Sequence, residues 1–460
     1  MNQQSEMSLK VIIIGAGEVG YHIARRLSAE AKDVVIIDRD PKALKRIIES
    51  IDVQIIEGSG SVPGILQSAG IDEADVLLAV TDSDEINIIA CTFASALAPD
   101  IVKLARIRND EYVNVGEHSV KTLLNIDKTI NPDVEVVKAI EQAVTVPQAS
   151  EIIDFSGGRV KLVGYRIGES SVVGRKLIHL PELMQGLSVI IAAIVRGEKL
   201  IIPSGEDVIE QDDLVYFVCM EDRVHDIMAS LGSKAEPVKS LLIIGGGDIG
   251  FRLAQRLERS YHVRLVENDA DRCQWLAQSL NRAIVLHGDG RDQDLLQEEN
   301  VKDMDMVVSL TGDEETNILT SLLAKSLGAK RAVTRINKFA YFPLVRAIGI
   351  ENIVSPRQSA VNSILQYMRK GMVISAASIR GDEAEALEAI VPEHSDLVGK
   401  AIKDLKLPKG ALILTIQRAG EIVFPSGDAV IEPGDRIVIL STRKTISRIE
   451  KRLEVKLESV

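Results

Sequence analysis

The chain carries the same sequence pattern twice, and this repeat constrains its fold more than any other feature. Residues 13–20 read IIGAGEVG and residues 243–250 read IIGGGDIG, so five of eight positions are identical at a separation of 230 residues. A second pattern, PSGEDVIEQDD at 203–213, returns as PSGDAVIEPGD at 425–435, with seven of eleven positions identical. Such a repeat predicts structural units that occur twice in the same order.

Four domains follow from this order, a larger and a smaller one in each half. A chain of 460 residues has room for them, at roughly 100–200 residues per domain. We expect the limits 1–147, 148–232, 239–371 and 372–460. The polar segment 232–237, with Gly at its start and Pro at its end, predicts the linker between the halves.

A glycine turn follows the first apolar run. The run VIII at 11–14 leads into GAGEVG, and a second apolar run at 34–37 ends at Asp38. Such runs predict strands of a parallel sheet buried on both faces. The first glycine permits a tight turn, the second lets the backbone approach a pyrophosphate, and the third lets helix and strand pack closely. The acid accepts hydrogen bonds from ribose hydroxyls and favours NAD over NADP. The candidate binding residues of this turn are Gly15, Ala16, Gly17, Glu18, Val19, Gly20 and Asp38.

The second copy contains the same elements. GGGDIG follows an apolar run, and an acid, Glu267, lies 17 residues after the last glycine. A glycine turn that binds nothing is the alternative at both places, and it has more weight at the second because one duplicate often diverges. The candidate binding residues of the second turn are Gly245, Gly246, Gly247, Asp248, Ile249, Gly250 and Glu267.

Later strands are expected to end at the same edge of each sheet, where ligands bind in open α/β sheets. The candidate residues there are Gly58, Ser59, Thr81 and Arg106 in the first copy and Gly288, Asp289, Thr311 and Arg335 in the second. The two arginines are candidates to pair with phosphates, and a salt bridge at a solvated strand end is the alternative. We interpret Asp84, Glu85 and Glu315 as helix caps or first-turn acids.

The smaller units have the pattern of small α+β modules without a catalytic motif. Arg196-Gly197-Glu198 predicts a hairpin turn between apolar runs. Asp212, Asp213 and Asp435 are interpreted as solvated turn residues. Amphipathic helices are expected after Pro132 and Pro356, as intrachain core elements or, alternatively, as dimer contacts.

Composition excludes several classes. With 54 Lys and Arg against 67 Asp and Glu, the net charge of −13 works against binding nucleic acid or anionic lipid. The three cysteines lie far apart and indicate a reducing compartment, and no Cys/His spacing indicates a metal site. The longest apolar run, at 189–195, is one strand long, so we expect a soluble, cytoplasmic protein without a transmembrane helix.

The order of units resembles the TrkA family of bacterial potassium-uptake subunits. The residues that carry the resemblance are GAGEVG at 15–20, Asp38, TDSDEIN at 81–87, GGGDIG at 245–250 and the two PSG turns at 203–205 and 425–427. The glycine pattern occurs in many families, whereas the fourfold order is more specific. The resemblance covers the chain from Lys10 onward.

The resemblance implies the following. The larger units correspond to N-terminal halves of RCK domains and the smaller ones to their C-terminal halves, giving two Rossmann-like doubly wound parallel sheets, each followed by a small α+β module. The candidate residues above would bind NAD(H), and ATP or ADP as further ligands. Tandem RCK chains would form a ring, with a tetramer expected, peripherally attached to the inner membrane beneath the potassium-translocating subunit that they gate. Two departures, Asp289 for Ser59 and Gly312 for Asp82, leave the ligand preference of the second site open.

Two other function classes fit the sequence less well. An NAD-dependent dehydrogenase would need a proton-transfer residue near the nicotinamide, and no His or Lys stands out for that role. A redox-sensing repressor would need a DNA-binding element, and the chain has a net charge of −13 and no helix-turn-helix candidate. A non-enzymatic regulatory subunit is therefore the leading hypothesis.

Overall fold

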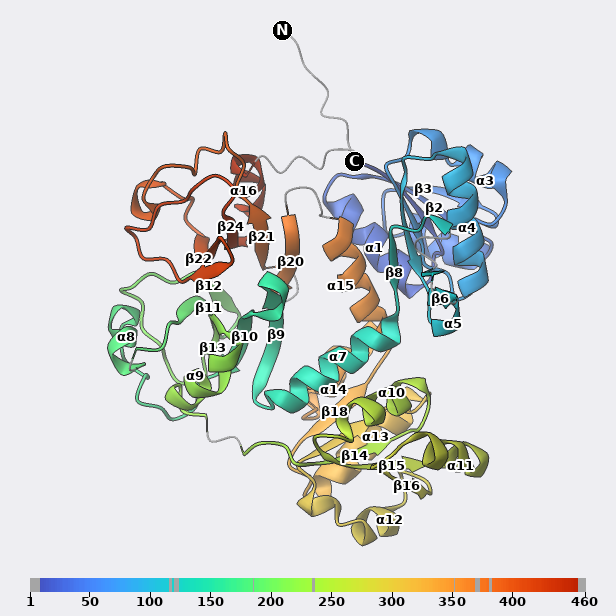
Figure 1. Ribbon diagram of the computed structural model, residues 1–460. Helices are drawn as coiled ribbons and strands as arrows, with labels where there is room; N and C mark the ends of the chain where they lie inside the picture. Colours follow the sequence, from blue (N-terminus) through green and yellow to red (C-terminus); the bar gives the residue numbers. More distant parts are fainter. Residues whose placement is uncertain are drawn as a thin grey trace. The chain divides into compact units, whose positions relative to one another are not determined.

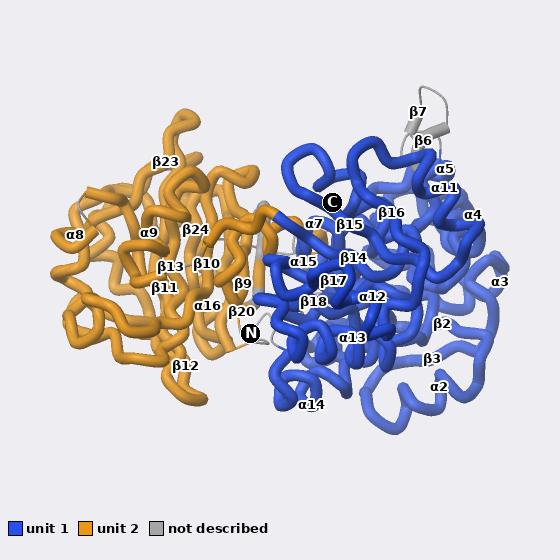
Figure 2. The backbone as a smooth tube through the Cα atoms, turned by 90° about the horizontal axis from the view of Figure 1, so that it is seen from below, with its two compact units in different colours: residues 1–140, 240–365, 459–460 blue, residues 141–239, 366–458 orange. Residues whose placement is uncertain are grey.

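The computed structural model describes residues 9–115, 118–119, 124–184, 186–233, 236–350, 352–368, 373–379 and 383–453. The predicted linker at 232–237 lies partly outside them, because 234–235 are omitted, as is residue 372, the expected start of the fourth domain. The chain divides into two compact units, and each combines segments from both halves of the sequence (Figure 2). The first unit comprises residues 1–140, 240–365 and 459–460, and the second comprises 141–239 and 366–458.

The first unit contains two parallel six-stranded sheets with the same strand order (Figure 1). The order of the first is β3-β2-β1-β4-β5-β8, and that of the second is β16-β15-β14-β17-β18-β19. The first sheet consists of β1 (Lys10–Ile14), β2 (Asp33–Asp38), β3 (Gln54–Glu57), β4 (Val76–Ala79), β5 (Val102–Arg106) and β8 (Lys128–Ile130). The second consists of β14 (Ser240–Ile244), β15 (His262–Glu267), β16 (Ile284–His287), β17 (Met306–Ser309), β18 (Ala332–Arg335) and β19 (Asn352–Val354). This order reverses at the first strand, which is the doubly wound topology expected from the sequence.

Helices cover both faces of each sheet because the central strands are apolar on both sides. In β1, Ile12 and Ile14 pack in the cluster that contains Ala90 and Ala94, whereas Ile13 faces α1 at Gly20. The helices of the first domain are α1 (Glu18–Ala29), α2 (Pro41–Ile48), α3 (Pro63–Ser68), α4 (Asp84–Leu97), α5 (Asp110–Val113) and α7 (Pro132–Thr145). A small hairpin joins β6 (Asn114–Val115) and β7 (His118–Ser119). The helices of the second are α10 (Asp248–Leu257), α11 (Ala270–Ser279), α12 (Gln293–Glu298), α13 (Glu314–Ser326), α14 (Phe342–Ala347) and α15 (Pro356–Met368). Both predicted amphipathic helices are present, as α7 and α15.

The two parallel-sheet domains contact each other through equivalent surfaces. The ring of His22 on α1 lies 4.1 Å from the ring of Phe339, centroid to centroid. At the equivalent positions, Arg252 Nη1 on α10 lies 2.5 Å from Asp110 Oδ2. In each pair the first helix of one domain contacts the segment after the fifth strand of the other. The two domains are therefore related by a pseudo-twofold arrangement within one chain.

The second unit contains two five-stranded sheets whose neighbouring strands are antiparallel. The first has the order β12-β11-β13-β10-β9 and the second β20-β21-β24-β22-β23. The first module consists of β9 (Ala149–Phe155), β10 (Val160–Arg166), α8 (Leu180–Leu183), β11 (Ile190–Arg196), β12 (Lys199–Ile201), β13 (Leu214–Met220) and α9 (Val224–Ser230). The second consists of β20 (Val373–Ile379), β21 (Ala384–Ile390), β22 (Ala411–Arg418), β23 (Glu421–Val423), β24 (Arg436–Thr442) and α16 (Ile446–Arg452). These are the predicted small α+β modules, and the hairpin turn predicted at Gly197-Glu198 joins β11 to β12.

The two modules share an apolar cluster, in addition to the cluster that each has of its own. Phe155, Leu162 and Val218 of the first pack in the same cluster as Leu414 and Leu440 of the second. A polar contact crosses the core as well, because the buried Glu388 accepts hydrogen bonds from Ser156 N–H at 2.8 Å and Ser156 Oγ at 3.1 Å. The two modules of the chain therefore fold against each other rather than standing apart.

The interpretation of Asp213 and Asp435 as solvated turn residues was wrong. Asp213 is 1% exposed and Asp435 is 2% exposed. Each accepts two hydrogen bonds from the arginine that ends a neighbouring strand, Arg196 at 2.9 and 2.8 Å and Arg418 at 2.8 and 2.7 Å. Burial raises the pKa of Asp435, but the Arg418 hydrogen bonds, the Glu432 N–H and the charge of Arg418 outweigh it and leave the pKa lowered. Asp212 alone is exposed, as expected.

Two further expectations can be compared with the described residues. None of the helices described there is long and apolar enough to cross a membrane. All three cysteines, Cys91, Cys219 and Cys273, are free and buried.

Candidate functional site

The two glycine turns have the backbone that the sequence pattern predicts. Gly15 has φ +109° and its N–H donates to Ile37 O at 2.8 Å, which ties the turn to the end of β2. A Cβ on Gly20 would lie 1.8 Å from Gly15 O, so helix and turn meet more closely than any other residue permits. Gly245 has φ +104° and a Cβ on Gly250 would lie 1.9 Å from Gly245 O. These four glycines are therefore required by the fold in both copies.

The middle glycine faces open space instead. Gly17 is the N-cap of α1, and a Cβ there would meet nothing within 4 Å. No side chain caps this helix end, so the first N–H groups of α1 lack a described intrahelical or side-chain acceptor. The same holds at Gly247 before α10. Each turn thus leaves backbone donors and a partial positive charge available to an anion.

The acid at the end of the second strand holds the turn in place. Asp38 accepts the Ala16 N–H on Oδ2 at 2.6 Å and the Asp40 N–H on Oδ1 at 2.8 Å. Glu267 accepts the Gly246 N–H on Oε2 at 2.7 Å and two further backbone N–H groups on Oε1 at 2.9 and 3.0 Å. Both oxygens of Asp38 and Oε2 of Glu267 keep a second lone pair, whereas Oε1 of Glu267 already accepts two hydrogen bonds. The expected hydrogen bonds to ribose hydroxyls are therefore compatible with these contacts.

A buried asparagine, to which the sequence analysis assigned no role, joins the ends of two strands in each copy. Asn87, with 0% exposure, accepts the Thr81 N–H at 3.0 Å and the Thr81 hydroxyl at 2.7 Å, and donates to Arg106 O at 2.8 Å. Asn317 makes the same contacts with Thr311 and Arg335 O. The repeat of Asn at a separation of 230 residues was the available signal. Thr81 and Arg106 are thus held side by side at the edge of the sheet.

Arg106 is engaged and yet incompletely satisfied. Its Nη1 lies 2.7 Å from Asp82 Oδ1, whereas its buried Nε has no hydrogen-bond partner among the described residues. Burial raises the pKa of Asp82, but the hydrogen bond and charge of Arg106, with the charges of Arg108 and Arg357, leave it lowered. Asp82 is 88% exposed at its side chain. An entering phosphate can therefore take the place of Asp82 on Arg106 without disturbing the core.

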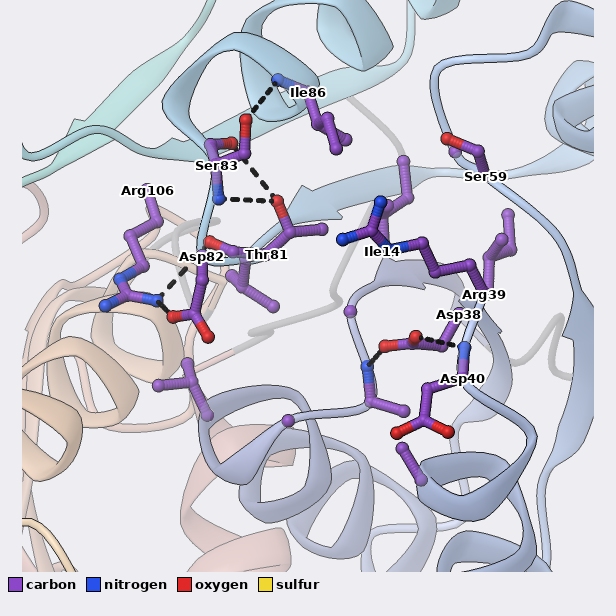
Figure 3. Close-up of a pocket in the computed structure, with 18 of the residues that line it drawn as sticks. Ile14, Asp38, Arg39, Asp40, Ser59, Thr81, Asp82, Ser83, Ile86 and Arg106 are labelled. Atoms are coloured by element: carbon purple, nitrogen blue, oxygen red, sulfur yellow. Dashed lines mark hydrogen bonds and ion pairs between the residues drawn. The ribbon is translucent and has the colours of Figure 1, made fainter.

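The glycine turn, Asp38, Thr81 and Arg106 line a cavity of about 730 Å³ at the carboxyl edge of the first sheet (Figure 3). The volume is in the range of small-molecule sites. Ten of the predicted residues line it: Gly15, Ala16, Gly17, Glu18, Val19, Asp38, Gly58, Ser59, Thr81 and Arg106. Gly20 does not line it, because it packs against the turn itself. The structure thus brings together residues that lie up to 91 positions apart in the sequence.

Three arginines of the cavity were not predicted. Arg39 directly follows Asp38, a neighbourhood that could have identified it, and Figure 3 shows its side chain extending over the cavity. Arg46 on α2 lies over the Tyr21 ring at 4.3 Å and pairs with Glu18 at 2.6 Å. Arg357 comes from α15 of the second domain. The cavity is therefore more cationic than the sequence indicated.

The second site differs in the side chains around the same backbone. Its predicted residues lie at the equivalent places: the turn before α10, Glu267 at the end of β15, Gly288 and Asp289 after β16, Thr311 after β17, and Arg335 at the end of β18. Asp289 is held by Arg291 through Nη2 at 2.7 Å and Nε at 3.0 Å. Arg272 donates from Nε to Gly246 O at 2.8 Å and lies 4.2 Å from the Trp275 ring centroid. The second site thus has an Asp289–Arg291 ion pair and Arg272 where the first has Ser59 and Ala43.

Known proteins match this chain over nearly its whole length. The TrkA-N domain family matches residues 11–132 and 241–356, and the TrkA-C domain family matches 162–232 and 386–454. The chain is 37% identical over 449 residues to the Trk system potassium uptake protein TrkA of Halomonas elongata, covering 97% of this chain and 98% of that protein. It is 38% identical over 452 residues to the Trk system potassium uptake protein TrkA homolog 1 of Methanosarcina mazei, covering 96% and 99%. The solved GsuK channel bound to NAD has a similar fold, with a TM-score of 0.60 at 16% identity, covering 98% of this chain and 80% of that chain.

Proposed function

The chain belongs to the TrkA family of Trk system potassium uptake proteins, and on that premise we propose that it is the nucleotide-binding regulatory subunit of such a system. It binds NAD(H), with ATP or ADP as further ligands, and gates a separate membrane subunit that translocates potassium. Binding energy would shift the assembly between states only if the ligand has different affinities for them.

Family membership sets aside the dehydrogenase hypothesis, because the relatives at this level of identity are potassium uptake proteins. The observation that carries the nucleotide proposal is the cavity at the first glycine turn. It combines unpaired helix N–H groups, a ribose-binding acid and arginines on one sheet edge. These are the three recognition elements of a phosphorylated nucleoside.

The proposal includes the site residues and the domain limits. Nucleotide contacts in the first domain are assigned to the turn 15–20, Asp38, Gly58, Ser59, Thr81 and Arg106, and those in the second to 245–250, Glu267, Gly288, Asp289, Thr311 and Arg335. The domains are proposed as 1–147, 148–232, 239–371 and 372–460. Tandem chains form a cytoplasmic ring, proposed as a tetramer, on the inner face of the cell membrane. The net charge of −13 suits an approach to basic cytoplasmic loops of the partner.

Calorimetric titration of the purified chain with NADH, NAD, ATP and ADP tests the proposal, with NADH absorbance followed for turnover. We expect saturable binding without oxidation. Absence of binding to all four nucleotides would contradict the proposal, and so would substrate-dependent consumption of NADH.

Gating requires a second experiment. The chain is added to vesicles that contain the potassium-translocating subunit of its own Trk system, and potassium flux is measured with and without each bound nucleotide. We expect flux to depend on both the chain and the nucleotide. Flux that depends on neither would contradict a regulatory role.

A further inference from the structure

The N-termini of α7 and α15 occupy equivalent positions in the pseudo-twofold arrangement. α7 begins at Pro132 and α15 at Pro356, and each proline is followed by a charged residue, Asp133 or Arg357. The contacts of His22 with Phe339 and of Arg252 with Asp110 place the two domains against each other through matching surfaces. The charge at the start of each helix can therefore be compared directly between the two sites.

Arg357 belongs to the first site although it lies in the second domain. It lines the cavity together with Glu18, Asp82 and Arg106. Burial raises the pKa of Glu18, but the Arg46 hydrogen bond and the charges of Arg46, His22 and Arg357 leave it lowered. The charge of Arg357 thus acts on Glu18 in the glycine turn and on Asp82, the ion-pair partner of Arg106.

Asp133 stands in the mirrored place toward the second site. Burial, with the charge of Asp248, leaves the pKa of Asp133 raised, against the opposing charges of Arg335, Arg108 and Arg106. Asp248 is the second-site counterpart of Glu18, and Arg335 is the counterpart of Arg106. Arg335 carries the same buried Nε without a hydrogen-bond partner among the described residues. At the equivalent helix start, the first site has a cation from the other domain and the second has an anion. The charges also act across the domain contact, that of Arg357 on Arg335 and that of Arg106 on Asp133.

We propose that each nucleotide site is completed by the other domain with opposite charge, so that the first takes a nucleoside polyphosphate and the second does not. Arg357 contacts the terminal phosphates of the ligand at the first site, beside Arg106. Asp133 competes with phosphate for Arg335 at the second site and repels it. The proposal rests on the proposed nucleotide-binding function and adds the source of specificity to it.

The first site has the features that such a ligand requires. A phosphate displaces the exposed Asp82 from Arg106 and meets the buried Nε of Arg106, which has no described partner. Charge-assisted bonds from two guanidiniums to phosphate oxygens are stronger than neutral hydrogen bonds. A single phosphate held at the glycine turn would leave Arg357 unused, so the contribution of Arg357 should grow with the length of the phosphate chain.

Arg357→Ala in the full-length chain tests the first half of the proposal by calorimetric titration with ATP and AMP. We expect ATP affinity to fall about tenfold to a hundredfold, the loss of a hydrogen bond to a charged group, and AMP affinity to change less than about twofold. Arg357→Lys should recover part of the ATP affinity. Arg346→Ala is the matched control, because it removes an exposed arginine from α14 of the same domain.

Asp133→Asn tests the second half. We expect the ATP stoichiometry to rise from one to two per chain, whereas Glu135→Gln removes the same charge from the same helix and should leave it at one. Equal loss of ATP and AMP affinity in Arg357→Ala would overturn the proposal, because it would indicate only a structural role. Unchanged ATP affinity in that variant, or a stoichiometry of one in Asp133→Asn, would also overturn it. A wild-type chain that binds NADH but not ATP contradicts this inference alone, and one that binds no nucleotide contradicts the proposed function as well.

Discussion

The two parallel-sheet domains have the same backbone at their sites and different side chains around it. Both keep the glycine with positive φ, the glycine packed against the turn, and the buried asparagine that joins two strand ends. At positions around the two proposed sites, Ser59 is replaced by Asp289, Asp82 by Gly312, and the cationic Arg357 by Asp133. The comparison separates the residues that the fold requires from those that we propose determine ligand preference.

The largest expected effect concerns what the domains share. Gly20→Ala and Gly250→Ala should each destabilise their domain by about 3 kcal/mol or more, because a Cβ would lie within 2 Å of a backbone oxygen that cannot move away. Gly64→Ala is the control, since a Cβ there meets nothing within 4 Å. The free energy of unfolding in urea measures all three. If only one of the two variants loses much of its free energy of unfolding, the two glycine turns are less equivalent than the structure indicates.

The next effect extends the comparison to the small modules. Asp213→Asn and Asp435→Asn should each cost about 2–3 kcal/mol, because each replaces a buried carboxylate that accepts two arginine hydrogen bonds, although Glu210 and Glu432 still pair with those arginines. Asp428→Asn removes an exposed ion pair with Lys403 and should cost less than about 1 kcal/mol. Thermal unfolding of the three variants gives the ranking. If Asp428→Asn costs as much as the other two, burial does not explain the strength of these pairs.

Ribose recognition should distinguish the two nucleotide sites. Asp38→Ala is expected to weaken NADH binding at the first site by about 1–3 kcal/mol, the scale of a lost hydrogen bond to a charged group. Since Asp38 also holds the turn, Asp38→Asn, which keeps an acceptor oxygen, should lose less. Glu267→Ala is the matched variant at the second site, and titration of all three with NADH measures the difference. Unchanged affinity in Asp38→Ala, with binding still at the first site, would contradict the ribose assignment.

The smallest effect concerns pH at the contact between the domains. Burial, with the charges of Arg25 and Arg46, lowers the pKa of His22 below its usual value, against the opposing charge of Glu18. The ring is therefore neutral in the folded protein near neutral pH. The stability that His22 contributes is complete above its ordinary pKa of about 6.5, and it is lost as the pH falls through the lower pKa of the folded state. The equivalent residue in the other domain is Arg252, which pairs with Asp110. Thermal unfolding between neutral and mildly acidic pH should show a small loss of stability that His22→Gln removes, and an identical loss in this variant would place the titrating group elsewhere.

Local patterns predicted the turns, and tertiary contacts decided the rest. Gly15, Gly20 and Asp38 were predictable because their roles depend on the few residues between the first strand and the second. Arg357 was not, because it reaches the first cavity only through the packing of the second domain. Asp213 and Asp435 were misread because an acid in a turn is usually solvated. In each half, however, the arginine that pairs with the acid lies 17 residues before it, Arg196 before Asp213 and Arg418 before Asp435. That repeated spacing was the signal that could have corrected the interpretation.

The pseudo-twofold arrangement within one polypeptide has a genetic consequence. In a dimer of identical chains, every substitution at the start of the helix that reaches the neighbouring site would appear in both sites at once. Because the two domains are encoded in tandem, the codon for residue 133 and the codon for residue 357 can change independently. Duplication within one gene thus lets one site acquire an arginine while its twin acquires an aspartate, and the surface between them stays the same.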